Sequence, residues 1–106
     1  MAEHHLSESN DRSVVDARVG DTIDVRLSEH ASGGYSWQLE SPTGAVLGAH
    51  DPEYEFAAGK VGGGNVARFR FEVRSSGREV IRLAYRRGWE TQQEPLRTCE
   101  LTIMAR

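Results

Sequence analysis

Apolar and polar residues alternate one for one in several separate stretches of this chain. The stretches are residues 21–27, 35–39, 68–74, 81–85 and 99–103. Because successive side chains of a β-strand point to opposite faces, the alternation predicts strands that each have one buried face. No stretch sustains the spacing of three and four residues that is typical of an amphipathic helix. We therefore expect a chain built from strands.

Turn signals separate these strands and indicate how they are arranged. Weaker strands are expected at residues 14–19 and within residues 46–56, which brings the total to about seven. Turn residues recur about every 8 to 12 positions, as in an antiparallel β-sandwich. Trp37 matches the buried tryptophan of immunoglobulin-like domains, although their paired cysteines are absent. The predicted fold class is all-β, an immunoglobulin-like antiparallel β-sandwich of about seven strands.

The 106 residues are enough for one domain with a single core. Residues 1–12 are polar and lack apolar periodicity, so we expect a disordered N-terminal tail ahead of one folded domain at residues 13–106. The first residues also lack the apolar centre of a signal peptide, and no stretch is long and apolar enough to cross a membrane. The expected location is cytoplasmic for the chain as it stands, and periplasmic or secreted if a leader has been removed.

Charge and cysteine content exclude several classes of partner and site. Thirteen Lys and Arg residues against sixteen Asp and Glu residues give a net charge of -3, which is too balanced to predict capture of nucleic acid or of an anionic membrane. Cys99 is the only cysteine, so neither an intramolecular disulfide nor a multi-cysteine zinc site can form. It shares an apolar face with Leu101 and Ile103, which predicts an inert core thiol and not a nucleophile.

The four histidines do not form a recognisable metal or catalytic pattern. His4 and His5 belong to the expected tail, while His30 and His50 stand far apart and beside no metal-binding spacing. The glycine-rich residues 61–65 lack the Lys-Ser/Thr of a phosphate-binding loop and precede a strand instead of a helix. Neither a nucleophile elbow nor a kinase signature is present. We therefore expect no metal, no cofactor, no catalytic residues and no enzymatic activity.

Three expected loops have compositions that are suited to binding. In the strand order of an immunoglobulin-like sandwich, the connections between the second and third, fourth and fifth, and sixth and seventh strands emerge at one end. Each could be a simple turn, since glycine supplies positive φ at low cost. Together, at one end, they favour a binding surface. The candidate residues are His30, Ala31, Ser32, Gly33, Gly34, Tyr35, Gly62, Gly63, Gly64, Asn65, Arg87, Gly88 and Trp89.

These three segments, in their order and separation, resemble the loops of the chagasin family of cysteine protease inhibitors. The family's loops read Asn-Pro-Thr-Thr-Gly-Tyr/Phe-x-Trp, then Gly-x-Gly-Gly before an aromatic strand, then Arg-Pro-Trp after a tyrosine. The matching positions here are residues 30–37, residues 62–65 ahead of Phe69, and residues 87–89 after Tyr85. The likeness extends from about residue 19 to the C-terminus.

The chain departs from the family pattern at several loop positions. His30 and Ala31 stand in place of Asn-Pro, Gly33 replaces the second threonine, Asn65 replaces the last glycine, and Gly88 replaces proline. Losing both prolines and gaining glycines leaves the loops less preorganised, which raises the entropy lost on binding. Weaker inhibition, or a different preferred protease, would follow.

The resemblance implies a reversible, non-covalent inhibitor that forms a 1:1 complex with a papain-like cysteine protease. In that family the first loop enters the active-site cleft and covers the catalytic thiolate, while the other two contact the cleft walls. The inhibitor itself is expected to be a monomer. An immunoglobulin-like adhesion or ligand-binding module using the same loops is the alternative, because fold alone does not decide function. A structural accessory domain of a larger assembly is a third, less favoured interpretation.

Overall fold

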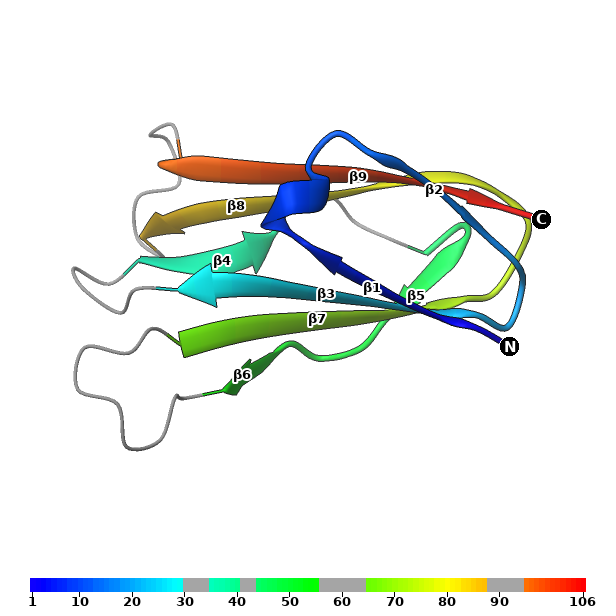
Figure 1. Ribbon diagram of the computed structural model, residues 1–106, viewed down its shortest axis with the longest axis horizontal. Coiled ribbons are helices and arrows are strands. Elements are labelled where there is room, and N and C mark those ends of the chain that lie inside the picture. Colours follow the sequence, from blue (N-terminus) through cyan, green and yellow to red (C-terminus); the bar gives the residue numbers. More distant parts are fainter. Residues whose placement is uncertain (30–34, 41–43, 56–64, 88–94) are drawn as a thin grey trace.

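A computed structural model describes residues 1–29, 35–40, 44–55, 65–87 and 95–106 of the chain (Figure 1). The elements within these residues are β1 (Glu3–Ser7), the 3-10 helix η1 (Glu8–Asn10), β2 (Val14–Ala17), β3 (Thr22–Glu29), β4 (Tyr35–Leu39), β5 (Leu47–Ala49), β6 (Glu53–Glu55), β7 (Asn65–Val73), β8 (Gly77–Arg87) and β9 (Arg97–Ala105). The strands predicted from alternation are all present, and the weak signal at residues 46–56 corresponds to the two short strands β5 and β6.

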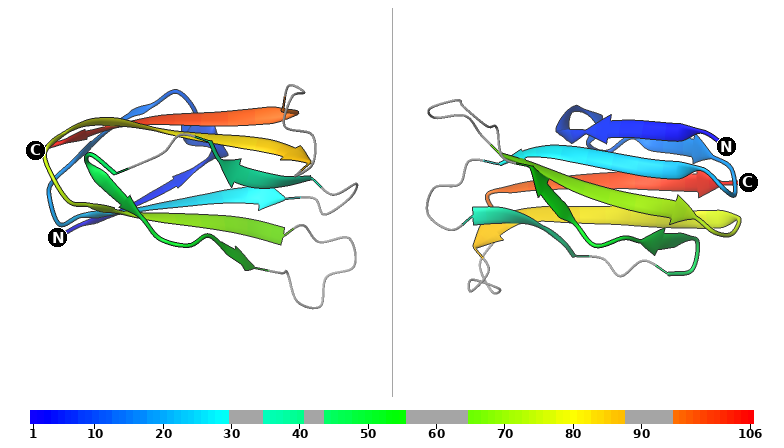
Figure 2. Two further views of the ribbon diagram at one scale, coloured as in Figure 1. Left: turned by 180° about the vertical axis from the view of Figure 1, so that it is seen from behind. Right: turned by 90° about the horizontal axis from the view of Figure 1, so that it is seen from below.

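The strands form two sheets whose order is that of a sandwich. One sheet has the order β1-β3-β7-β5, with β6 also pairing with β7, and the other has the order β2-β9-β8-β4. The long strands of both sheets run along the long axis of the molecule (Figures 1 and 2). Buried side chains from the two sheets form one hydrophobic cluster. The all-β sandwich predicted from the sequence is therefore confirmed.

The sheets are mixed, which the prediction of a wholly antiparallel sandwich did not include. β3, β5 and β6 pair antiparallel with β7, and β8 pairs antiparallel with β4 and β9. In contrast, β1 runs parallel to β3, and β2 runs parallel to β9. Parallel pairing requires a long connection between the partners. Such a connection exists here, because the chain crosses to the other sheet through β2 before it returns as β3.

The N-terminal residues differ from the expected disordered tail. β1 pairs with β3 along its whole length, from Glu3 opposite Thr22 to Ser7 opposite Arg26. Leu6 packs against the core cluster, and the residues between β1 and β2 include η1. Ordering comes from backbone pairing at the open edge of a sheet, which needs few apolar side chains. The folded unit therefore begins near Glu3 and not at residue 13.

The core has the composition that alternation predicts. Trp37 is fully buried, and so is Cys99. Burial, followed by the nearby Asp11 and Glu8 carboxylates, raises the pKa of the Cys99 thiol to about 11. The thiol is therefore protonated at neutral pH and is unsuited to nucleophilic chemistry. The other fully buried large apolar side chains are Ile23, Val25, Leu27, Leu47, Phe71, Val73, Ile81, Leu83, Leu101 and Ile103.

Candidate functional site

Strand ends from both sheets meet at one end of the sandwich, on the left in Figure 1. Glu29, the last residue of β3, is paired with Asn65, the first residue of β7. Tyr35, the first residue of β4, is paired with Arg87, the last residue of β8. The chain therefore leaves and re-enters the sheets at this end for three connections, which we name the loop end. The connections themselves, residues 30–34, 56–64 and 88–94, lie outside the described part of the chain.

The described structure includes three of the predicted binding residues. Tyr35 is half-buried at the start of β4, and Arg87 lies opposite it at the end of β8. The backbone of Asn65 begins β7. The remaining predicted residues, His30, Ala31, Ser32, Gly33, Gly34, Gly62, Gly63, Gly64, Gly88 and Trp89, fall outside the described residues.

Three aromatic rings and two guanidinium groups pack together beneath the loop end. The Tyr35 and Tyr85 rings stack with their centroids 5.6 Å apart, and the Trp37 ring lies 5.3 Å from that of Tyr85. The Arg87 guanidinium is 4.8 Å from the Tyr35 centroid. The Arg97 guanidinium is 4.7 Å from the Tyr85 centroid and 5.2 Å from that of Trp37. Cation–π and stacking contacts of this kind are each worth about 0.5 to 1.5 kcal/mol, and together they join β4, β8 and β9 where the loops begin.

Arg97 also connects the two sheets. Its Nη2 donates to the carbonyl oxygen of Ser28 at 3.0 Å, and its Nη1 lies 3.0 Å from a carboxylate oxygen of Glu8. Ser28 belongs to β3 in the other sheet, while Glu8 belongs to η1. One side chain of β9 therefore contacts β3 and η1, in addition to the rings of Trp37 in β4 and Tyr85 in β8. Sequence reasoning missed Arg97, because a charged residue at the start of a strand carries no signal of such contacts.

Glu29 is a second residue at the loop end that the sequence analysis missed. Its side chain is only 5% exposed, and its Oε2 accepts a hydrogen bond of 2.9 Å from the backbone N–H of Trp37. A signal for it does exist in the sequence. Glu29 continues the inward-facing series of Val25 and Leu27, where an apolar residue would be expected.

The chemistry available to the described residues is that of a contact surface. His4 lies against Asp21, and His50 is exposed. In the part of the chain that is described, no group of three His, Cys, Asp or Glu residues is placed to hold a metal ion. No helix among the described residues is long and apolar enough to cross a membrane. What the described part of the loop end offers is the half-buried Tyr35 ring, the Arg87 guanidinium and strand ends held at fixed separations.

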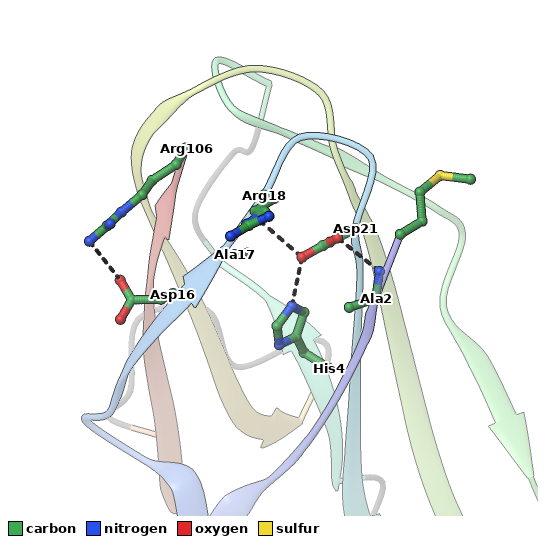
Figure 3. A pocket seen from close by; sticks show the side chains of 8 residues that line it. Ala2, His4, Asp16, Ala17, Arg18, Asp21 and Arg106 are labelled. Carbon is green, nitrogen blue, oxygen red and sulfur yellow. Dashed lines mark hydrogen bonds and ion pairs between the residues drawn. The ribbon is translucent and has the colours of Figure 1, made fainter.

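A cavity of about 520 Å³ lies at the opposite end, near the two termini (Figure 3). Its central group is the Asp21 carboxylate, which accepts hydrogen bonds of 2.9 Å from the backbone N–H groups of Ala2 and Arg18 and contacts His4 Nε2 at 2.9 Å. The bond from Ala2, then those from His4 and Arg18, hold the pKa of Asp21 well below its usual range. The hydrogen bonds of Asp21 beside this cavity attach β1 to the fold, and the cavity lies away from the loop end.

The attachment of β1 through Asp21 is expected to weaken in acid. Because the pKa of Asp21 is lower in the folded chain than in the unfolded chain, its stabilisation is complete above the unfolded pKa of about 4 and is lost as the pH falls further toward the folded pKa. Thermal unfolding of the wild type and Asp21→Asn between pH 6 and pH 2 tests this. The wild type should be the more stable at pH 6, and the difference should shrink below about pH 4. A difference that stayed constant with pH would contradict the assignment.

The sequence of this chain is similar to those of known proteins over nearly its whole length. A family model described as "Chagasin family peptidase inhibitor I42" matches residues 16–103. Amoebiasin-2 from Entamoeba histolytica is 29% identical over 107 residues, which cover 99% of this chain and 87% of amoebiasin-2. The matched range includes all three segments that connect the strands of the loop end.

Solved structures give the same likeness. The crystal structure of the cysteine protease inhibitor EhICP2 from Entamoeba histolytica has a TM-score of 0.87 and 28% identity, covering 100% of this chain and 97% of that inhibitor. The structure of PbICP-C in complex with falcipain-2 has a TM-score of 0.68 and 14% identity, covering 98% of this chain and 89% of PbICP-C. At that lower identity the likeness concerns the fold.

Proposed function

Because this chain belongs to the chagasin family of peptidase inhibitors, we propose that it blocks the active-site cleft of a papain-like cysteine protease with the three segments of its loop end. The family is one of peptidase inhibitors, and EhICP2 is a cysteine protease inhibitor. The chain is accordingly a cysteine protease inhibitor, and the prediction that it is not an enzyme is confirmed by its family. What we propose beyond this is the part of the surface that inhibits and the class of protease.

The observation that supports the loop end as the inhibitory surface is the register of the strands that bear it. Glu29 pairs with Asn65 in one sheet, and Tyr35 pairs with Arg87 in the other. The three segments that resemble the family's loops therefore all begin and end at the loop end of the sandwich. A surface made of three adjacent segments can contact both walls and the floor of a cleft, whereas one turn cannot.

Each segment has a proposed role that follows from its residues. Small residues around Gly34 allow the backbone of the first segment to enter a narrow cleft and to cover the catalytic thiolate. Trp89 can bury a large rigid surface against one wall, and Arg87 can pair with acidic or carbonyl groups at the rim. The second segment, Gly62 to Asn65, contacts the opposite wall. None of these groups forms a covalent bond, so inhibition is reversible.

An inhibition panel tests this proposal. Papain-type cysteine proteases are expected to be inhibited with 1:1 stoichiometry, while serine, aspartic and metalloproteases serve as controls and keep their activity. The inhibitor should be recovered uncut, because reversible steric blocking leaves both chains intact. No inhibition of any papain-type enzyme at micromolar inhibitor would contradict the proposal and would favour an adhesion or ligand-binding role for the same loops.

A further inference from the structure

A buried carboxylate lies where the first of the three segments leaves the fold. Glu29 is the last residue of β3, and its side chain is 5% exposed. Glutamate is seldom buried to this degree unless its oxygens have partners, because desolvating a charge is costly. The position is also the last one before residues 30–34.

The hydrogen-bond partner of Glu29 is in β4, the strand that follows residues 30–34 in the sequence. Its Oε2 accepts a hydrogen bond of 2.9 Å from the backbone N–H of Trp37. Backbone N–H groups of a β-strand point alternately to its two sides. Glu40 N donates to the carbonyl oxygen of Arg82 in β8, so the N–H groups of Gln38 and Ser36 also point toward β8. The N–H of Trp37 therefore points the other way, to the side of β4 that has no neighbouring strand in the described sheet. Glu29 satisfies a donor that the described strands leave without a partner.

A second hydrogen bond joins the end of β3 to Trp37 in β4. Trp37 Nε1 donates to the carbonyl oxygen of Ser28 at 3.0 Å. Trp37 itself is fully buried and packs against Tyr85, so it is a rigid point of attachment. Two hydrogen bonds thus join residues 28 and 29, just before the first segment, to residue 37, just after it. We name this pair of bonds the base clamp.

We propose that Glu29 is a positioning residue for inhibition, one that presets the geometry in which residues 30–34 are presented to the protease. This inference rests on the proposed function. Glu29 acts through the backbone of Trp37 and needs no contact with the target. Its effect is to reduce the conformational freedom that the first segment loses on binding. That effect matters more because residues 31–34 are alanine, serine and two glycines, which restrict the backbone little by themselves.

The chain offers a matched control for this role. Glu79, in β8, also joins the two sheets by accepting backbone hydrogen bonds: its Oε2 from Val46 N at 2.7 Å and Leu47 N at 2.8 Å, and its Oε1 from Gly44 N at 2.8 Å. It lies near the start of β8, whereas the loop end lies at the end of that strand. Glu79 therefore performs the same structural chemistry away from the inhibitory surface.

The experiment compares inhibition constants and melting temperatures for the wild type, Glu29→Ala, Glu29→Gln and Glu79→Ala against one papain-type protease. Glu29→Ala should raise the inhibition constant at least about tenfold, the scale of one lost charge-assisted hydrogen bond. Glu29→Gln keeps an acceptor oxygen and should stay within about threefold of the wild type. Glu79→Ala should lower the melting temperature while its folded fraction inhibits within about threefold of the wild type. If Glu29→Ala does not fold, Glu29→Asp, which is one methylene too short to reach Trp37 N, takes its place.

The outcomes separate this inference from the proposed function. If the wild type inhibits and Glu29→Ala inhibits equally well, the positioning role is refuted and the proposed function stands. Equal losses for Glu29→Ala and Glu79→Ala would also refute it, because general destabilisation would then be the cause. If the wild type inhibits no papain-type enzyme, the proposed function fails; amide exchange in the free protein then decides whether the base clamp exists, since Glu29→Ala should specifically speed exchange of the Trp37 N–H.

Discussion

Replacing Trp37 by alanine is expected to lower the free energy of unfolding by about 3 to 5 kcal/mol, the usual cost of truncating a large buried aromatic side chain. Trp37 is fully buried, packs on Tyr85 and lies under the Arg97 guanidinium. The substitution also removes the hydrogen bond from Nε1 to the carbonyl oxygen of Ser28. Urea unfolding followed by circular dichroism measures the loss. A loss below about 1 kcal/mol would mean that the sheets pack without this ring.

Trp89 is the matched control for this experiment, because the proposed function assigns it to the protease and not to the core. Trp89→Ala should leave the unfolding free energy nearly unchanged and should weaken inhibition by about 2 kcal/mol, the scale of an interface hot spot. The two tryptophans should thus separate stability from binding. The reverse result, an unfolded Trp89→Ala with unchanged affinity per folded molecule, would place Trp89 in the core.

The second large effect is expected at Gly34, where a glutamate should weaken inhibition at least about 30-fold, or about 2 kcal/mol. Under the proposed function, Gly34 lies against the floor of the protease cleft, and any side chain there occupies space that the target needs. Ser36→Glu introduces the same charge two residues away. Ser36 pairs with Arg86 and alternates with the inward-facing Trp37, so its side chain points away from the core and tolerates the change.

Comparing Gly34→Glu with Ser36→Glu separates position from charge. Inhibition constants for both variants and the wild type are measured after circular dichroism has verified that all three are folded. Equal losses would refute the idea that the first segment enters the cleft. The contact surface would then have to be sought around the second segment, at Gly62 to Asn65, and the third, at Arg87 to Trp89.

The strands that sequence analysis predicted are those with a clear difference between their two faces. β3 places Ile23, Val25 and Leu27 inward, and β9 does the same with Leu101 and Ile103. These strands form mainly because one face of each is buried, and the alternation of apolar and polar residues indicates which face that is. The position of the loop end followed from sandwich topology, and the strand registers bear it out.

Features that depend on contacts remote in sequence could not be predicted in this way. β1 contains a single large apolar residue, Leu6, and is ordered by backbone pairing with β3 and by the His4–Asp21 contact. Neither interaction leaves a periodic pattern in the local sequence. Arg97 was missed for a related reason, whereas Glu29 was missed although the alternation of β3 places it on the inward face. Pattern reasoning places charged residues on the outside, whereas these two have partners that only the assembled sandwich supplies.

The place of β9 within its sheet has a consequence for how the protein folds during synthesis. Of the described strands, β9 is the last to be synthesised, yet it lies between β2 and β8. Until it emerges, β2 lacks the strand that it pairs with among the described elements, and pairing Val14 with Thr102 then closes a loop that spans most of the chain. The entropy of that closure is lost in one late step. Because β9 also supplies Arg97, the core and the framework beneath the loops should become ordered together, after β9 has been made.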